Sequence, residues 1–283
     1  MGNTRTPVIT KKQVASLLPP RQHDSHKAQF GNVAVIGGCN GMTGAALLAG
    51  RAALKLGAGC VHVGLLADNA PAVDMQQAEL MLHPAPVALK LPKLDVIAIG
   101  CGMGHDINAQ KILHDALKMD AILVIDADAL NMLAMRPDLR SMLSTRKAPS
   151  VITPHPGEAA RLLGNTSEEV QATRQASALE LAKRMHCSVV LKGAGSLCVT
   201  QEGKTWFNNT GNPGMSSPGM GDVLSGMIAA FIAQGLNTDN AMLLAVHLHG
   251  AAGDALAAQQ ATIGMTATEV TEWARWLLNQ WLK

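Results

Sequence analysis

Apolar and polar positions along the chain form two kinds of segment that alternate. Short runs rich in Val and Ile, several of them ending at glycine, are separated by alanine-rich stretches whose apolar residues recur with helical spacing. Runs that are apolar at nearly every position are typical of strands buried on both faces, as in parallel sheets covered by helices on each side. The pattern therefore predicts a doubly wound α/β fold.

The expected elements can be placed between boundaries of glycine, proline and polar residues. Strands are expected at residues 33–36, 61–66, 95–99, 122–126, 151–153 and 189–191, with 196–200 as a hairpin partner. Helices are expected at residues 44–56, 107–118, 157–163, 170–185, 222–234, 239–259 and 268–281. No Pro/Ser-rich linker or charge block interrupts the series, so residues 1–283 are expected to form one domain.

Composition narrows the classes of function. Of the 283 residues, 48% are hydrophobic and 16% charged, which is typical of a soluble globular protein with a large core. The formal charge is +2, Lys and Arg are scattered, and aromatic residues make up only 2%. Neither a basic groove nor a base-stacking platform is indicated, so nucleic acid is not an expected partner.

Cysteine usage and the apolar runs predict a cytoplasmic protein. The five cysteines are dispersed without a CxxC pair, so neither a zinc site nor a disulfide framework is indicated. The first ten residues lack an apolar signal core, and no uninterrupted apolar run reaches the roughly 18 residues of a membrane span. Neither export nor insertion into a membrane is expected.

Two glycine-rich turns near the start of the chain could approach a ligand. The first, residues 37–44, lacks the GxGxxG spacing of a dinucleotide-binding fold. Asp68 falls in the loop beyond the second strand, so no acid ends that strand to hold a ribose, and a dehydrogenase is not expected. The second turn, residues 100–104, is rich in glycine, so a ligand could approach its backbone closely. A tight turn that binds no ligand would explain the same glycines equally well.

The third glycine-rich turn, residues 211–222, has the strongest chemical pattern. Backbone N–H groups of Gly219, Met220 and Gly221 at the start of a helix can bind an anion whose charge grows during phosphoryl transfer. Asp222 adjoins them and can take a proton from a substrate hydroxyl, which is the division of labour in a kinase. The alternative is that Asp222 only caps the helix.

The sequence around this third turn resembles the ribokinase-like enzymes. Residues 219–222 (GMGD) are similar to their GxGD motif, and GNPGM…GMGDVLSG resembles the NAD(P)H-hydrate dehydratase branch in particular. Further stretches fit that branch: Ser25-His26-Lys27 with Phe30-Gly31, MTGAA at 42–46, DADAL at 126–130, TPHPGE at 153–158, KGAGS at 192–196, and His249-Gly250 with Gly253-Asp254. The resemblance extends over about residues 10–258 and implies a three-layer α/β/α sandwich around a mostly parallel sheet.

The resemblance also implies a reaction. The substrate would be the S epimer of hydrated NADH or NADPH (NADHX or NADPHX), with ADP as cosubstrate and AMP and phosphate as products. Phosphorylating the 6-hydroxyl would turn a poor leaving group into a good one, which the ring nitrogen then expels. Mg²⁺ is implied as phosphate partner, although no dedicated carboxylate cage is visible. A separate epimerase is expected as metabolic partner, because the family often carries a fused one and this chain has no room for it.

The family's functional positions can be matched to this sequence. Asp222 would be the general base, and Gly219, Met220 and Gly221 would form the anion hole. Lys192, Gly193, Ala194, Gly195 and Ser196 would line the nucleotide site together with Gly221. Ala45, Gly102 or Gly104, His155 and Asp222 would face the hydrated nicotinamide nucleotide. The chain departs from the family pattern at Pro218, Cys101 and Ala28, which stand where Gly, Pro and Gly are usual.

Several polar side chains have other interpretations. His155 can also be a surface histidine. His247 and His249 are two apart on a predicted helix and point in different directions, so core packing is expected and a metal site is not. Asp126 and Asp128 end a strand at the ligand-binding edge, where they can order water or metal, and Asp128 can instead cap the next helix.

Two rival functions remain open in the sequence. A ribokinase-fold kinase of a vitamin precursor, such as a hydroxymethylpyrimidine or hydroxyethylthiazole, would share the GxGD motif, but residues 25–27 and 153–158 favour the dehydratase. A silent nucleotide-binding module is conceivable because of Pro218, and the retention of Asp222 speaks against it. A homo-oligomer is expected, although Trp273, Trp276 and Trp281 are interpreted first as a core-facing stripe.

Overall fold

The centre of the protein is one 9-stranded sheet, seen in a computed structural model that describes residues 6–18, 20–260 and 262–282. Residues 1–5 and 283, which are the two ends of the expected 1–283 domain, lie outside these ranges. The spatial order of the strands is β3 (Met81–Pro84), β2 (Cys60–Leu65), β1 (Asn32–Gly37), β4 (Val96–Ile99), β5 (Ile122–Ile125), β6 (Ser150–Ile152), β7 (Ser188–Leu191), β8 (Leu197–Val199) and β9 (Thr205–Phe207). The strands from β3 to β7 are parallel, and β8 pairs antiparallel with both β7 and β9. The predicted mostly parallel sheet is confirmed.

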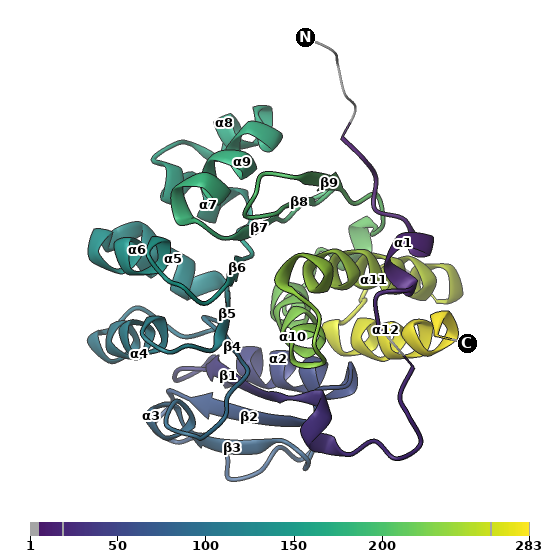
Figure 1. The fold of residues 1–283 in the computed structure, drawn as a ribbon, viewed down its shortest axis with the longest axis horizontal. Helices are drawn as coiled ribbons and strands as arrows, with labels where there is room; N and C mark the ends of the chain where they lie inside the picture. Colours follow the sequence, from purple (N-terminus) through teal and green to yellow (C-terminus); the bar gives the residue numbers. More distant parts are fainter. Residues whose placement is uncertain (1–5, 19, 261, 283) are drawn as a thin grey trace.

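Side chains alternate between the two faces of the sheet and enter two separate cores. In β1, Val33 and Val35 belong to one core, whereas Ala34 and Ile36 belong to the other. The first core is covered by α2 (Thr43–Lys55), α10 (Met220–Ala233), α11 (Thr238–Gln259) and α12 (Ala267–Trp281). The second is covered by α3 (Ala85–Ala88), α4 (Ile107–Leu117), α5 (Ala127–Met135), α6 (Pro137–Ser144), α7 (Pro156–Leu163), α8 (Ser167–Ala172) and α9 (Arg174–Met185). Figure 1 shows α4 to α6 and α10 to α12 on opposite sides of the strands, so the predicted three-layer α/β/α sandwich is confirmed.

The predicted strands all occur, each shifted by at most one residue at either end. The strands β3 and β9 were not predicted. Both lie at the edges of the sheet, and β9 has only three residues, all of them half-buried. A short edge strand lacks the continuous apolar run that marks a strand covered on both faces, which is why the pattern does not reveal it.

The predicted helices also occur, with one correction and some additions. The helix expected over residues 170–185 is two helices, α8 and α9, which divide at Thr173, where φ is −129°. The helices α5 and α6, and the short α3 and α1 (Lys11–Ala15), were not predicted. Two further 3₁₀ turns, η1 (Lys27–Phe30) and η2 (Pro213–Met215), precede β1 and α10.

The helix α10 is buried along almost its whole length. Gly226 faces α2, where a Cβ atom would overlap the carbonyl oxygen of Ala49. The missing side chain therefore lets the two helix backbones approach closely. The next helix, α11, is long and apolar enough to cross a membrane, but 67% of its most apolar window is buried inside the protein, as in a core helix.

The C-terminal helix α12 corrects the expectation for the tryptophans. Its core-facing residues are smaller ones, including Val270, Ala274 and Leu278. Trp276 is 53% exposed, and its ring meets that of Trp273 edge to face with centroids 5.5 Å apart. Trp273 and Trp281 are partly buried and pack against this core, so the expected core-facing stripe is wrong only for Trp276.

Candidate active site

The first two glycine-rich turns lie side by side at the carboxyl edge of the sheet. The amide of Gly38 donates to the carbonyl of Cys101 at 2.9 Å. One residue further on, the amide of Cys39 donates to the carbonyl of Gly102 at 2.7 Å. A Cβ atom on Gly102 would come within 3.0 Å of the Ala45 side chain. The structure therefore brings Ala45 and Gly102 together, as a shared surface for a ligand requires.

The third glycine-rich turn leads into α10 and presents unpaired backbone donors. Gly219 is the N-cap residue with φ +89°, a conformation that favours glycine. The N–H groups of Gly219, Met220 and Gly221, called the nest below, have no hydrogen-bond partner among the residues that the structure describes. Pro218 is exposed and precedes the cap, so the nest keeps all three donors. An anion placed here would also meet the positive end of the α10 dipole.

Asp222 lies in the first turn of α10 and is half-buried. It is not the helix cap, because Gly219 holds that position, so the capping alternative is wrong. Burial raises the pKa of Asp222 to about 6, and the charge of Asp126 adds to this effect, while a hydrogen bond with Cys101 and the charge of Lys192 oppose it. A carboxylate with this pKa is ionised at neutral pH and remains basic enough to accept a proton from a reacting hydroxyl.

A buried charge cluster lies next to the nest. It consists of Asp126, Lys192 and Glu158. The Lys192 Nζ lies 2.6 Å from Asp126 Oδ1 and 3.9 Å from Glu158 Oε2. Burial alone would lower the pKa of Lys192, but the charges of Asp126 and Glu158 outweigh it and raise that pKa. Asp126 also accepts from Ser225 Oγ at 2.8 Å, which ties α10 to the end of β5. A Cβ atom on Gly221 would lie 3.2 Å from Lys192 Nζ, so the cluster and the nest touch.

On one side of Asp222 is a cavity of about 500 Å³, here called the nucleotide cavity. All the positions predicted for the nucleotide line it: Lys192, Gly193, Ala194, Gly195, Ser196 and Gly221. Asn208 and His249 line it as well, although the sequence did not mark them for this role. The side chain of Asn208 is held by the carbonyl of Thr210 at 3.2 Å.

His249 was expected to be a core residue and is both buried and part of the cavity wall. Its Nε2 has no hydrogen-bond partner within the described part of the chain. Burial lowers the pKa of His249 to about 4, and the charge of Lys192 contributes, so the ring is neutral at neutral pH. The described residues contain no group of three or more His, Cys, Asp and Glu side chains that could hold a metal ion.

Arg174 holds the loop that forms the floor of the nucleotide cavity. Its guanidinium donates to the carbonyl of Leu191 at 3.1 Å, of Gly195 at 3.2 Å and of Lys192 at 3.4 Å. These carbonyls lie on both sides of Gly193, whose φ of +140° requires glycine. The contacts make Arg174 a positioning residue for the loop between β7 and β8.

Replacing Arg174 with glutamine is expected to raise the KM for ADP by about tenfold to one hundredfold, because hydrogen bonds from a charged donor are worth about 1.5–3 kcal/mol. The turnover number should change much less, since Asp222 and the nest are untouched. Steady-state kinetics with varied ADP measures this split. Arg184→Gln on the same helix is the matched control, because its exposed side chain pairs only with Glu180 and Leu163. An unchanged KM for ADP in Arg174→Gln would show that the loop holds its shape without the guanidinium.

His155 follows β6 and is the N-cap of α7. Its Nδ1 accepts from the amides of Gly157 at 3.0 Å and Glu158 at 3.4 Å, which places the proton of the neutral ring on Nε2. Burial and the charge of Lys192 lower the pKa of His155. The ring is half exposed and adjoins the charge cluster through Glu158, and among the described residues no hydrogen bond or ion pair joins it to Ala45 or Gly102.

The cap of α5 is not the aspartate that the sequence suggested. Asp126, not Asp128, is the N-cap of α5, with its carboxylate 2.8 Å from the amide of Ala127. Asp128 accepts instead from the amide of Gly104 at 2.9 Å and lies 3.3 Å from His105 Nε2. It therefore fixes the second glycine-rich turn beside Asp222.

A family model described as NAD(P)H-hydrate dehydratase matches residues 33–275. The chain belongs to this family. The ADP-dependent (S)-NAD(P)H-hydrate dehydratase of Neisseria meningitidis is 39% identical to it, over 99% of this chain and 96% of that protein. A crystal structure of the ADP/ATP-dependent NAD(P)H-hydrate dehydratase from Bacillus subtilis, co-crystallised with ATP and Mg²⁺, has a TM-score of 0.88 at 29% identity and covers 98% of this chain and 99% of that one.

Other relatives of this dehydratase family are longer. The bifunctional NAD(P)H-hydrate repair enzyme Nnr of Coxiella burnetii is 38% identical over 98% of this chain but only 56% of its own length. The chain thus spans about half the length of the curated bifunctional enzymes it matches. The family resemblance drawn from the sequence motifs is confirmed.

Proposed function

We propose that the chain catalyses the ADP-dependent dehydration of the S epimer of hydrated NADH or NADPH, giving the reduced cofactor, AMP and phosphate. The observation that carries this proposal is the position of Asp222. It is a half-buried carboxylate with a pKa near neutral, beside an unpaired nest and between the nucleotide cavity and the paired glycine turns. The names of the relatives, including the dehydratase of Neisseria meningitidis, support the same reaction.

In this proposal ADP occupies the nucleotide cavity with its terminal phosphoryl group at the nest. Lys192, Gly193, Ala194, Gly195 and Ser196 line its path together with Gly221. The hydrated nicotinamide lies over Ala45, Gly102 and Gly104, with His155 at the far side. Its 6-hydroxyl then meets Asp222 and faces the terminal phosphoryl group directly, so the carboxylate can take the proton while the hydroxyl oxygen attacks the phosphorus.

The chemistry proceeds in two stages. Asp222 takes the proton of the 6-hydroxyl. At the same time the hydroxyl oxygen forms a bond to the terminal phosphorus of ADP, and the bond from that phosphorus to AMP breaks. The nest stabilises the charge on the transferring oxygens. The lone pair of the ring nitrogen then expels phosphate from C6, and loss of a proton from C5 restores the dihydronicotinamide. The sum is hydrate plus ADP to reduced cofactor, AMP, phosphate and a proton.

Mg²⁺ is proposed as the partner of the ADP phosphates. Mg²⁺ usually takes one or two carboxylates from the protein and the rest of its ligands from phosphates and water. The residues present fit this, because Asp222 follows Gly221 in the first turn of α10 and Asp126 Oδ2 would lie 3.5 Å from a Cβ atom on Gly221. When bound, the ion would neutralise phosphate charge.

An activity that interconverts the epimers is proposed as metabolic partner, because only one epimer is the substrate. The names of the bifunctional relatives support such a coupling of two repair activities. We also propose, from the sequence expectation, that the chain assembles as a homo-oligomer. The exposed Trp276 on α12 is the residue to monitor for burial in such an assembly.

The test is to incubate the protein with ADP and separated epimers of hydrated NADH and to follow the absorbance of the reduced nicotinamide. Absorbance should return with the S epimer alone, and AMP should form in equal amount. Phosphorylation of a vitamin precursor without any hydrate turnover would instead identify a kinase. Calorimetric binding of ADP without turnover of either substrate would identify a silent nucleotide-binding module.

The pH dependence of the reaction is a second expected result. The base must be deprotonated, so kcat/KM should be flat above the pKa of Asp222, about 6, and should fall tenfold per pH unit below it. Initial rates between pH 5 and about 8 measure the profile. A rate that rises as the pH falls would show that an acid limits the reaction and that Asp222 is not the base.

A further inference from the structure

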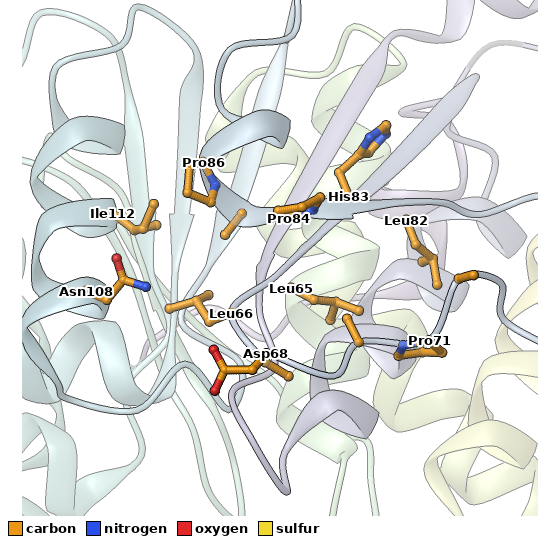
Figure 2. Close-up of a pocket in the computed structure, with 14 residues that line it drawn as sticks. Leu65, Leu66, Asp68, Pro71, Leu82, His83, Pro84, Pro86, Asn108 and Ile112 are labelled. Carbon is orange, nitrogen blue, oxygen red and sulfur yellow. The ribbon is translucent and has the colours of Figure 1, made fainter.

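A second cavity, of about 480 Å³ and here called the edge cavity, lies outside the machinery described so far. Figure 2 shows it between the ends of β2 and β3 and the helices α3 and α4. Its apolar part comes from Leu65, Leu66, Leu82, Ile112 and several prolines, and its polar residues are Asp68, His83 and Asn108. His83 is engaged elsewhere, since its Nε2 lies 3.1 Å from His62 Nδ1. The other polar side chains of the cavity are Asn108 and Asp68, and the Asp68 carboxylate has one oxygen, Oδ1, with no hydrogen bond to the described residues.

The edge cavity opens at the same edge of the sheet as Asp222. Asp222 adjoins the turn after β4, while the cavity begins where β2 ends, two strands further out. With strands about 4.8 Å apart, the separation is about 10–15 Å. A mononucleotide over the second glycine turn does not reach that far, whereas an extended dinucleotide does.

The first glycine-rich turn links the two places. Asn40 in that turn donates to Asp68 Oδ2 at 2.9 Å and accepts from the Asp68 amide at 3.1 Å, so it fixes the aspartate at the rim. The turn leads into the N-terminus of α2, and a Cβ atom on Gly41 would meet nothing within 4 Å. A pyrophosphate crossing from Asp222 to the cavity would pass over open backbone at a helix N-terminus, where an anion is favoured.

We infer that the edge cavity binds the adenosine half of the hydrated dinucleotide, with Asp68 accepting hydrogen bonds from the ribose hydroxyls. This inference rests on the proposed function, which places the hydrated nicotinamide over Ala45 and Gly102. The adenine lies against Leu66 and the prolines, which offer an apolar slot for a flat ring. ADP does not compete for this place, because its own cavity lies on the other side of Asp222 and shares no lining residue with this one.

The charge of the cavity sets a preference between the two hydrates. A carboxylate accepts hydrogen bonds from a ribose diol, whereas a 2′-phosphate requires a cation such as arginine. The residues that line the edge cavity include Asp68 and no Lys or Arg. The protein should therefore act on hydrated NADH in preference to hydrated NADPH.

The experiment measures kcat/KM for hydrated NADH, hydrated NADPH and hydrated reduced nicotinamide mononucleotide, which lacks the adenosine half. The wild-type protein should prefer hydrated NADH to hydrated NADPH by at least about tenfold, as one unpaired charged group costs about 10 to 100-fold in binding. Asp68→Ala should lose about tenfold on hydrated NADH, and Asp68→Arg should reverse the preference. Neither change should alter the KM for ADP or the rate with the mononucleotide.

Two further variants keep the result interpretable. Leu66→Trp fills the cavity without changing charge and should raise KM for both dinucleotide hydrates and not for the mononucleotide. Asp120→Ala removes an exposed aspartate at the opposite edge of the sheet and should keep wild-type values. One outcome is that the wild type dehydrates the S epimer and the Asp68 and Leu66 variants have the same relative kcat/KM values for the three hydrates as the wild type. The edge cavity then does not bind adenosine, and the proposed function still stands. If the wild type dehydrates no hydrate, both the function and this inference are overturned.

Discussion

Replacing Asp222 with asparagine is expected to lower the turnover of hydrated NADH by at least about one hundredfold, because a positioned general base contributes roughly 100 to 10,000-fold. Asparagine keeps the shape of the side chain and removes its basicity. The affinity for ADP and the melting temperature should change little, since the nest and the cap at Gly219 are backbone features. Single-turnover kinetics with ADP and the S epimer measure the loss of the chemical step.

The matched control for this variant is Asp239→Asn. Asp239 also lies in the first turn of a long helix, α11, and it accepts from Ser188 Oγ at 2.7 Å, far from the nest. Any effect of removing a negative charge from a helix N-terminus, about 0.3–1 kcal/mol, should appear in both variants. Near-full dehydratase activity in Asp222→Asn would mean that Asp222 is not the base and that the kinase-like mechanism is wrong.

Replacing Lys192 with methionine is expected to lower the free energy of unfolding by about 3–5 kcal/mol, the usual cost of removing one partner from a buried ion pair. The side chains of Asp126 and Glu158 are 2% and 5% exposed, so neither carboxylate can find water in place of the lost ammonium. Urea unfolding followed by circular dichroism measures the change. Lys204→Met is the control, because Lys204 and its partner Glu202 are 68% and 73% exposed and such pairs contribute about 0–1 kcal/mol.

The effect of Lys192→Met should depend on pH in a defined direction. In the wild type, Lys192 lowers the pKa of Asp126 although burial acts against it, so this carboxylate stabilises the fold above its unfolded pKa. Without the ammonium, burial raises the pKa of both carboxyls, and the variant gains stability relative to the wild type as they take up protons. Because protonation and folding are linked, the loss in free energy of unfolding caused by Lys192→Met should be larger at pH 8 than at pH 5. A deficit equal at both pH values would show that lost packing, not charge, causes it.

The sheet could be predicted well because its strands are buried on both faces and form continuous apolar runs. The helix over residues 170–185 was predicted as one because no glycine or proline marks the division at Thr173. The helix α5 was missed because the sequence from Asp126 to Asp128 was interpreted as a ligand-binding end, whereas its first aspartate is the cap of the helix.

The candidate site could be predicted where one local segment provides it. The loop from Lys192 to Ser196 and the turn at residues 219–222 are each contiguous in sequence, and the structure brings the loop and Gly221 to one cavity. The charge cluster could not be predicted, because its members follow β5, β6 and β7 and meet only when the sheet has formed. His249 was missed for a related reason, since its helical spacing is that of a core residue and only the packing of α11 exposes it to the cavity.

The hydrogen bond between Ser225 and Asp126 has a thermodynamic consequence. The helix α10 bears the nest at its start, is pinned to β5 by this bond and packs against α2 at Gly226. A segment buried to this degree belongs to the last cooperative unit to open, so its hydrogen-bonded amides, unlike the unpaired amides of the nest, exchange with solvent only when the whole domain unfolds. The body of α10 therefore does not melt separately from the rest of the domain, and heat should disrupt the nest and the fold in a single transition.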